Sequence, residues 1–376
     1  MGQVLRVTLA LLVFVTVLEL CARLDDRICF GAPMWRPYNV DNLYENDALG
    51  KHGKPYARYK KWQLNSLGFR GPELRDGTVR IVCFGASETF GLYEEPGKEY
   101  PRQLEDDLNA WAGSPRFQVV NVAYPGQSVA TSVTRVPEIV SKIHPRFAVI
   151  YPALAEYIWL PWLPPSRAVA PDPPAAPRLE WRLADRLKAF AKSVVPLAFQ
   201  TWLRKREIVS ASAKFPVLQC IGPESEARFR FDLLRLTQEL QAAGVTPILV
   251  THATTFGSAA SAQSLSERDR DLLISWRKFY PMLQENGFID MEHRLNETMR
   301  DLARGQNLEL IDAARRLPAG EQYFSDFSHL TNRGAAVMAG ELAQEIIPLL
   351  AQPAGSAPPA SKPVAAEPQS SAPGDR

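Results

Sequence analysis

The stretch Arg80–Gly91 reads R-I-V-C-F-G-A-S-E-T-F-G and predicts a strand, a sharp turn and the start of a helix. Four apolar residues, Ile81 to Phe84, form a run of strand length that Gly85 ends, and Ser87 stands on the turn. A serine at the carboxyl end of a buried parallel strand lies where open α/β sheets bind ligands, beside the free N–H groups of a helix start. The pattern is typical of a nucleophile, although a serine that only caps a helix would produce the same local sequence.

A second informative stretch, Tyr323–Gly334, lies near the other end of the chain and reads Y-F-S-D-F-S-H-L-T-N-R-G. Asp326 and His329 precede a predicted helix, and their spacing allows one turn to direct both side chains the same way. A serine nucleophile needs a base, and the base needs a carboxylate that orients it. We therefore predict Ser87, Asp326 and His329 as the catalytic residues.

Together the two stretches resemble the SGNH (GDSL-type) hydrolase superfamily, in particular its membrane-anchored bacterial branch. Gly85–Gly91 stands where the family has G-D-S-x-T-x-G, with Ala86 in place of the aspartate, and Asp326–His329 stands where it has D-x-x-H. The resemblance covers residues 65–348 and implies a three-layer α/β/α, flavodoxin-like fold with a mainly parallel sheet. It also implies acyl transfer by a serine triad, with no cofactor and no metal.

The resemblance assigns the oxyanion to two backbone N–H groups, those of Ser87 and Gly126. From the residues alone, Gly126 is an ordinary turn glycine after a strand. The family's third block, G-x-N-D or G-x-N-E, adds an asparagine as a further donor, but residues 153–156 of this chain are Ala, Leu, Ala and Glu. Loss of one such donor typically costs about 10² to 10³ in rate.

Several polar residues near the predicted strand ends are candidates for the pocket or for the missing donor. We predict that Glu156, Tyr157 and His252 line the pocket, although a lone histidine after a strand is more often a structural hydrogen-bonding residue. A substitute oxyanion donor could come from Tyr151, Tyr157, Asn121 or His252, and the sequence does not rank these four residues.

Apolar segments of strand length alternate with amphipathic segments, which independently indicates a parallel sheet covered by helices on both faces. After the strand that carries Ser87, strands are predicted at residues 119–123, 147–151, 245–251 and 308–311. Helices are predicted at 100–111, 131–143, 225–243, 268–283, 290–302 and 333–350. Residues 161–214 form a proline-rich and basic insertion, with one amphipathic helix at 181–209. This helix could cover the site, lie on a membrane surface or bind an acidic glycan, or simply present a solvated face.

The N-terminal residues 1–23 predict a signal anchor. Arg6 precedes the apolar run Val7–Leu18, and no small-residue cleavage site follows it. A cleaved signal peptide is the alternative, and both interpretations place the catalytic domain outside the cytoplasm, on the periplasmic side of the inner membrane in a Gram-negative cell. We further predict a juxtamembrane stalk and lead-in segment at residues 24–79, the hydrolase domain at 80–350 and a disordered tail at 351–376.

Composition limits the range of partners. A net charge of +2 argues against nucleic acid binding. Four cysteines lack metal-ligand spacing, and a bridge between Cys29 and Cys220 is allowed but not required. From the family resemblance we expect removal or transfer of O-acetyl groups on a cell-envelope or secreted polysaccharide. The alternatives are a catalytically weak or inactive glycan-binding or assembly protein, and a lipid esterase at the membrane.

Overall fold

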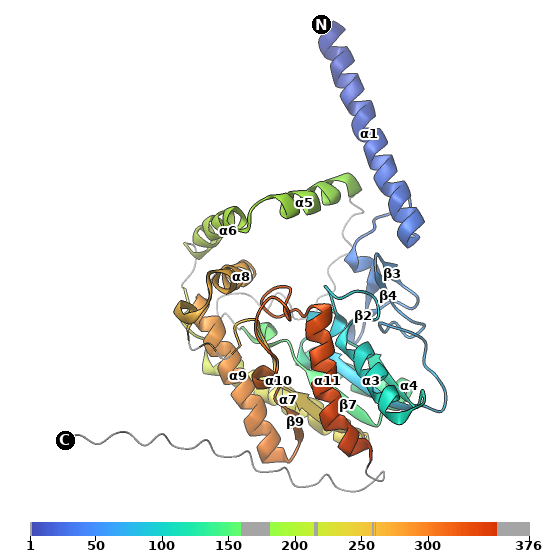
Figure 1. The fold of residues 1–376 in the computed structure, drawn as a ribbon, viewed down its shortest axis with the longest axis vertical. Helices are drawn as coiled ribbons and strands as arrows, with labels where there is room; N and C mark the ends of the chain where they lie inside the picture. Colours follow the sequence, from blue (N-terminus) through green and yellow to red (C-terminus); the bar gives the residue numbers. More distant parts are fainter. Residues whose placement is uncertain (1, 159–180, 214–216, 258, 260, 352–376) are drawn as a thin grey trace, which may run out of the picture.

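The computed structural model describes residues 2–158, 181–213, 217–257, 259 and 261–351. Its centre is a five-stranded parallel sheet in the order β6-β5-β7-β8-β9 (Figure 1). The strands are β5 (Val79–Gly85), β6 (Phe117–Asn121), β7 (Phe147–Tyr151), β8 (Thr246–Val250) and β9 (Glu309–Ile311). This arrangement confirms the predicted fold class. It also places β5, which leads into Ser87, between two neighbours in the sheet.

Helices cover both faces of the sheet. One core cluster joins one face of the sheet to α4 (Val129–Ile143), α7 (Pro223–Ala242) and α9 (Glu285–Gln306). The opposite cluster joins the other face to α3 (Tyr100–Ala112) and α11 (Asn332–Leu350), which pack on each other. Successive residues of β5 alternate between the two clusters, Ile81 and Cys83 in one and Val82 and Phe84 in the other. This is the three-layer architecture that a strand buried on both faces requires.

The predicted helix at 181–209 is wrong in one respect, because the structure has two helices there. They are α5 (Arg182–Val194) and α6 (Leu197–Ser212), and the break falls at Pro196. Proline has no backbone N–H and disfavours a helical residue before it, and Val195 is accordingly extended. The helix predicted at 268–283 is shorter, α8 (Glu267–Arg277), and α9 begins earlier than predicted. The proline-rich part of the insertion and residues 352–376 of the predicted tail lie outside the described residues.

The N-terminal helix α1 (Gly2–Phe30) projects from the body of the molecule (Figure 1). Among the described residues it is the one helix long and apolar enough to cross a membrane, which is consistent with an anchor. It continues past residue 23, the predicted end of the anchor. Two hairpins that the sequence did not predict follow it, β1 (Tyr44–Asp47) with β2 (Gly50–Gly53), and β3 (Arg58–Tyr59) with β4 (Trp62–Gln63). Cys29 and Cys220 are both free thiols.

The segment Asn65–Gly71 positions the loop that follows the serine turn. The side-chain oxygen of Asn65 accepts hydrogen bonds from the backbone N–H groups of Leu67 and Phe69, both at 3.0 Å. The buried Arg70 donates to the carbonyl oxygens of Phe90 and Gly91 and to Glu99 Oε2 at 3.1 Å. Arg70 is therefore a structural clamp on the chain just beyond Ser87.

Candidate active site

Ser87 is the first residue of the short helix α2 (Ser87–Phe90), which starts directly after β5. The turn is tight because α2 folds back over the strand: a Cβ atom on Gly85 would lie 2.0 Å from Thr89 Oγ1. Glycine is therefore the residue that fits between strand and helix. The Ser87 hydroxyl donates to Glu88 Oε2 at 3.2 Å.

Asp326 and His329 form the predicted pair. His329 Nδ1 lies 2.9 Å from both carboxylate oxygens of Asp326, and Asp326 Oδ1 also accepts from the backbone N–H of His329 at 2.9 Å. This contact places the ring proton on Nδ1 and leaves Nε2 as an acceptor. Nε2 is buried and has no hydrogen-bond partner among the described residues. The geometry is that of a base held in the correct tautomer.

Two contacts join the serine turn to the histidine loop. Ser328 Oγ donates to Glu88 Oε1 at 2.9 Å, and the backbone N–H of Glu95 donates to Asn332 Oδ1 at 2.9 Å. The structure therefore brings together the two stretches that the sequence singled out. It does not form a hydrogen bond between Ser87 and His329, because the Ser87 hydroxyl is turned to Glu88.

His252 extends this network, as its position just after β8 predicts. Its Nε2 lies 3.6 Å from Glu88 Oε1, and its Nδ1 lies 2.9 Å from Glu292 Oε2. The ring stacks on Tyr151 with centroids 5.3 Å apart. Asn296 holds the backbone of His252 from both sides, accepting from its N–H at 2.8 Å and donating to its carbonyl at 2.9 Å.

Burial and neighbouring charges shift the pKa values of His252, Glu88 and His329. Burial opposes a charge on His252, but Glu292 and Glu88 raise its pKa to about 10. Burial alone would raise the pKa of Glu88, yet His252 and His329 hold that pKa below its usual range. For His329, burial disfavours the charged ring, whereas Asp326 and Glu88 raise its pKa above the ordinary value. Glu88 therefore influences the pKa of His329 as well as accepting a hydrogen bond from Ser87.

Sequence reasoning missed the roles of Glu88, Glu292 and Ser328. All three are buried polar residues whose partners come from distant parts of the chain. The available signals were weak. One signal was Glu88, a charged residue beside Ser87 in a turn of otherwise small and apolar residues. The other was the spacing of Glu292 and Asn296, which places both on one side of a helix.

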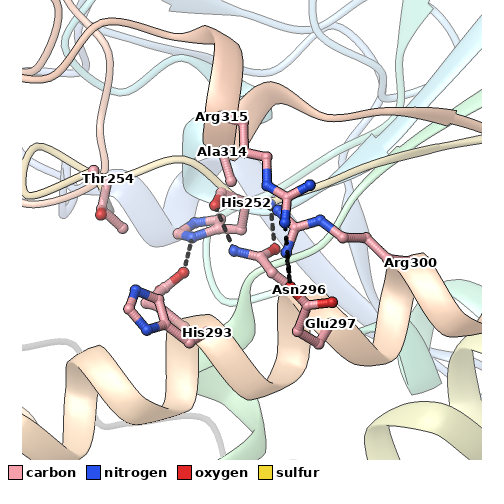
Figure 2. Close-up of a pocket in the computed structure, with 10 residues that line it drawn as sticks. His252, Thr254, His293, Asn296, Glu297, Arg300, Ala314 and Arg315 are labelled. Carbon is pink, nitrogen blue, oxygen red and sulfur yellow. Dashed lines mark hydrogen bonds and ion pairs between the residues drawn. The ribbon is translucent and has the colours of Figure 1, made fainter. Parts of the chain in front are cut away.

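A polar cavity of about 250 Å³ lies behind His252, at the carboxyl ends of β8 and β9 (Figure 2). Figure 2 shows His252 between the α9 side chains and the short helix α10 (Ala313–Arg316), which carries Arg315. Arg300 in its wall is neutralised, since it donates to Asp312 Oδ1 at 2.7 Å and to Glu297 Oε1 at 2.7 Å. His252 lines this cavity and also lies 3.6 Å from Glu88, so it contacts both the cavity and the residue next to Ser87.

The predicted pocket residues Tyr157 and Glu156 have their contacts outside this network. Tyr157 donates to Asp232 Oδ2 at 2.9 Å and packs on Phe229, within the helical layer of α7. Glu156 is half-buried beside it. The pKa of Tyr124 is raised by burial, and the negative charge of Glu156 adds to this effect. Gly126 is exposed with φ +79°, in the turn between β6 and α4.

Two of the four proposed substitute donors are also occupied by structural contacts. Asn121 donates to the carbonyl oxygen of Thr89 at 2.7 Å, and the Tyr151 hydroxyl accepts from the N–H of Ala253 at 3.1 Å. Tyr157 is bound to Asp232, as described above. Of the four, His252 is therefore the one that lies against the residue next to Ser87.

No protein-family model and no curated protein matches the chain. Its fold is similar to that of several solved structures. A lipase/acylhydrolase from Enterococcus faecalis is 16% identical with a TM-score of 0.42, covering 72% of this chain and 95% of that one. A GDSL-like lipase from Bacteroides thetaiotaomicron is 14% identical with a TM-score of 0.39, covering 72% and 88%. An acetyl xylan esterase is 14% identical with a TM-score of 0.41, covering 71% and 98%. Similarity at this level assigns no role to any residue of this chain.

Proposed function

We propose that this chain is an SGNH-type serine ester hydrolase or O-acyltransferase in which Ser87, His329 and Asp326 are the catalytic residues. The observation that supports this most directly is the Asp326–His329 pair. It holds a buried, unpartnered Nε2 on a loop that is bonded to the serine turn through Ser328 and Glu88. A free imidazole nitrogen beside a serine is what general-base activation requires.

In the proposed reaction the Ser87 hydroxyl exchanges its hydrogen bond from Glu88 to His329. Ser87 Oγ then attacks the ester carbonyl while His329 Nε2 takes its proton, and the N–H groups of Ser87 and Gly126 hold the oxyanion. The C–O bond breaks, and His329 returns the proton to the departing alcohol. Water or a sugar hydroxyl then removes the acyl group by the same steps in reverse.

We further propose that the acyl group is acetyl and that the substrate is a cell-envelope or secreted polysaccharide outside the cytoplasm. Two features support this: the resemblance of the motifs to membrane-anchored SGNH proteins, and an N-terminal helix of spanning length. The acyl acceptor, water or sugar, distinguishes a hydrolase from a transferase.

Two features favour a second candidate, a catalytically weak or inactive glycan-binding protein of the same fold. The family's oxyanion asparagine is missing, and Ser87 bonds to Glu88 instead of the base. Each feature would lower the rate of an esterase, and binding needs neither an oxyanion hole nor an activated serine.

The test is covalent labelling of the full-length protein in detergent with a fluorophosphonate serine probe, together with turnover of a chromogenic acetyl ester. We expect Ser87→Ala to abolish both signals and His329→Ala to lower them by about 10² or more, since a general base typically contributes 10² to 10⁴. Ser141→Ala, on the exposed surface of α4, is the matched control and should label like the parent. A folded parent that does not label would favour the binding protein.

A further inference from the structure

The first turn of α5 is capped by a residue of α1. The Glu19 carboxylate accepts hydrogen bonds from the backbone N–H groups of Arg182 at 3.2 Å and Leu183 at 2.8 Å. First-turn N–H groups have no acceptor within their own helix, and Trp181 at the N-cap position supplies none. Arg23 Nε pairs with the same carboxylate at 2.7 Å. Glu19 directly follows the apolar run Val7–Leu18, and its contacts attach the N-terminal end of α5 to α1.

A second set of contacts fixes α5 to α1 one turn further along. Arg186 donates to Asp25 Oδ2 at 2.6 Å and to Asp26 Oδ1 at 2.8 Å. These contacts begin at Glu19, whereas the large apolar side chains of α1 up to Leu18 are exposed. Beyond Glu19 the exposed Leu20, Leu24 and Ile28 are interspersed with charged residues, so the uninterrupted apolar part of α1 ends close to where α5 begins. With α1 across a bilayer, α5 starts at the level of the lipid headgroups.

α5 carries an apolar stripe that is left exposed. Leu187, Phe190 and Val194 recur at helical spacing, and each is more than half exposed. Asp185 and Lys192 lie on the opposite side of the helix. A helix of this length is marginal in water on its own and gains most of its stability by burying an apolar face. The stripe therefore requires an apolar surface to cover it.

α6 has an inner face and an outer face. On the inner face, Arg204 donates to Ser275 of α8, and Ile208 is buried. In Figure 1, α8 lies below α6, whereas the N-terminal end of α1 lies above it. The outer face of α6 consequently points to the side of the body from which α1 projects.

The outer face of α6 combines aromatic, aliphatic and basic residues. Phe199 and Trp202 stack with centroids 5.6 Å apart, and the Arg206 guanidinium lies 5.0 Å from the centre of the Trp202 ring. Leu203 and Val209 are exposed beside them. Tryptophan with arginine at the edge of an apolar surface is typical of segments that lie in a membrane interface, and the cation favours anionic lipid.

We propose that α5 and the outer face of α6 lie in the headgroup region of the same bilayer that α1 crosses. Leu187, Phe190 and Val194 would insert at the level of the upper acyl chains, and Arg206 would contact lipid phosphates. This proposal rests on α1 as a membrane anchor but not on the chemistry at Ser87. It makes the insertion a second membrane contact that sets the distance and tilt of the catalytic domain relative to the bilayer.

The test uses the full-length protein in liposomes of phosphatidylethanolamine and phosphatidylglycerol. The exposed Cys21, Cys29 and Cys220 are replaced by serine, and an environment-sensitive fluorophore is attached to Phe190→Cys or, as the matched control, to Asp185→Cys on the opposite side of α5. We expect lipids that carry a quencher near the headgroup to quench the Phe190 probe several-fold more than the Asp185 probe. A probe on Leu12→Cys in α1 reports separately whether the anchor is inserted.

Arg206→Glu should reduce quenching of the Phe190 probe in phosphatidylglycerol liposomes, with labelling by the serine probe unchanged. Equal quenching at both positions of α5, with the Leu12 probe quenched, would overturn the proposal. The proposal would also be overturned if the fluorescence of the Phe190 probe depended on the number of protein molecules per liposome and not on quencher lipid. That result would indicate that a second copy of the chain covers the apolar stripe of α5. Because serine labelling is measured in the same liposomes, failure of the proposed chemistry would be recognised separately.

Discussion

Glu88 is the residue through which charge reaches the proposed base. Its carboxylate accepts from Ser87 and Ser328, lies 3.6 Å from His252 and raises the pKa of His329. At neutral pH a raised pKa leaves a smaller share of His329 neutral and able to accept a proton. Activity should therefore rise with pH, with a midpoint above the ordinary histidine value of about 6.5.

Replacing Glu88 by glutamine should move this midpoint to lower pH. Removal of this nearby negative charge lowers the pKa of His329, because the Glu88 carboxylate favours the protonated ring. The measurement is the rate of serine-probe labelling against pH. Burial raises the pKa of Glu94 to about 7, so Glu94→Gln is the control that identifies any contribution of this second group. An unchanged midpoint in Glu88→Gln would contradict the role given to Glu88.

His252 should make stability depend on alkaline pH. Its pKa is about 10 in the folded protein and close to 6.5 when unfolded. The stabilisation is fully present below the unfolded value and is lost as pH rises through the folded value. We expect the midpoint of thermal unfolding to fall between neutral pH and pH 10, and to fall much less in His252→Gln. If the unfolding midpoint changes with pH equally in the parent and in His252→Gln, the His252 ring is not charged in the folded protein.

At the scale of the elements, the start of α11 is constrained by close packing behind the histidine loop. A Cβ atom on Gly334 would lie 1.9 Å from the carbonyl oxygen of Tyr323, whereas nothing lies within 4 Å of one on Gly340 in the same helix. Gly334→Ala should destabilise the protein by about 1 to 3 kcal/mol, the typical cost of forcing extra atoms into a packed site. It should also slow serine labelling, because the displaced chain carries His329.

Gly340→Ala is the matched substitution and should stabilise the protein by about 0.8 to 1 kcal/mol, the difference in helix propensity. Denaturant unfolding of the two variants measures both effects. A Gly334→Ala variant as stable as Gly340→Ala would show that the contact with Tyr323 relaxes freely.

The elements show what local sequence can predict. The five strands and most helices carry apolar periodicity, so their order and the parallel sheet were predicted from the sequence. Two short motifs predict Ser87, Asp326 and His329 as catalytic residues, and this role stays a prediction. The hairpins at residues 44–63 were not predicted, because the aromatic and basic residues of this segment lack the period-two pattern of a strand. Glu88, Ser328 and Glu292 were not predicted because their contacts join distant segments: Ser328 in the last loop bonds to Glu88 in α2, and Glu292 in α9 bonds to His252 after β8.

At the scale of the whole molecule, α1 is the element that is long and apolar enough to serve as a membrane anchor among the described residues. Its contacts with α5 through Glu19 and Asp26 favour an uncleaved anchor, since a cleaved signal peptide would take these partners away. We expect the exported protein to keep its N-terminal residues and to stay in the membrane fraction after alkaline extraction. Recovery of a soluble protein that begins beyond Ala22, measured by intact mass, would favour the cleaved form.

The joining of two distant segments also bears on when the protein becomes active. Ser87 begins α2 directly after β5, whereas His329 precedes α11, which packs on α3 and is tied to Glu95 through Asn332. During synthesis Ser87 emerges from the ribosome long before His329, and the last helix must be released before it can dock. A nascent chain therefore lacks the contacts between the serine turn and the histidine loop, and the proposed activity can begin only after synthesis of the domain is complete.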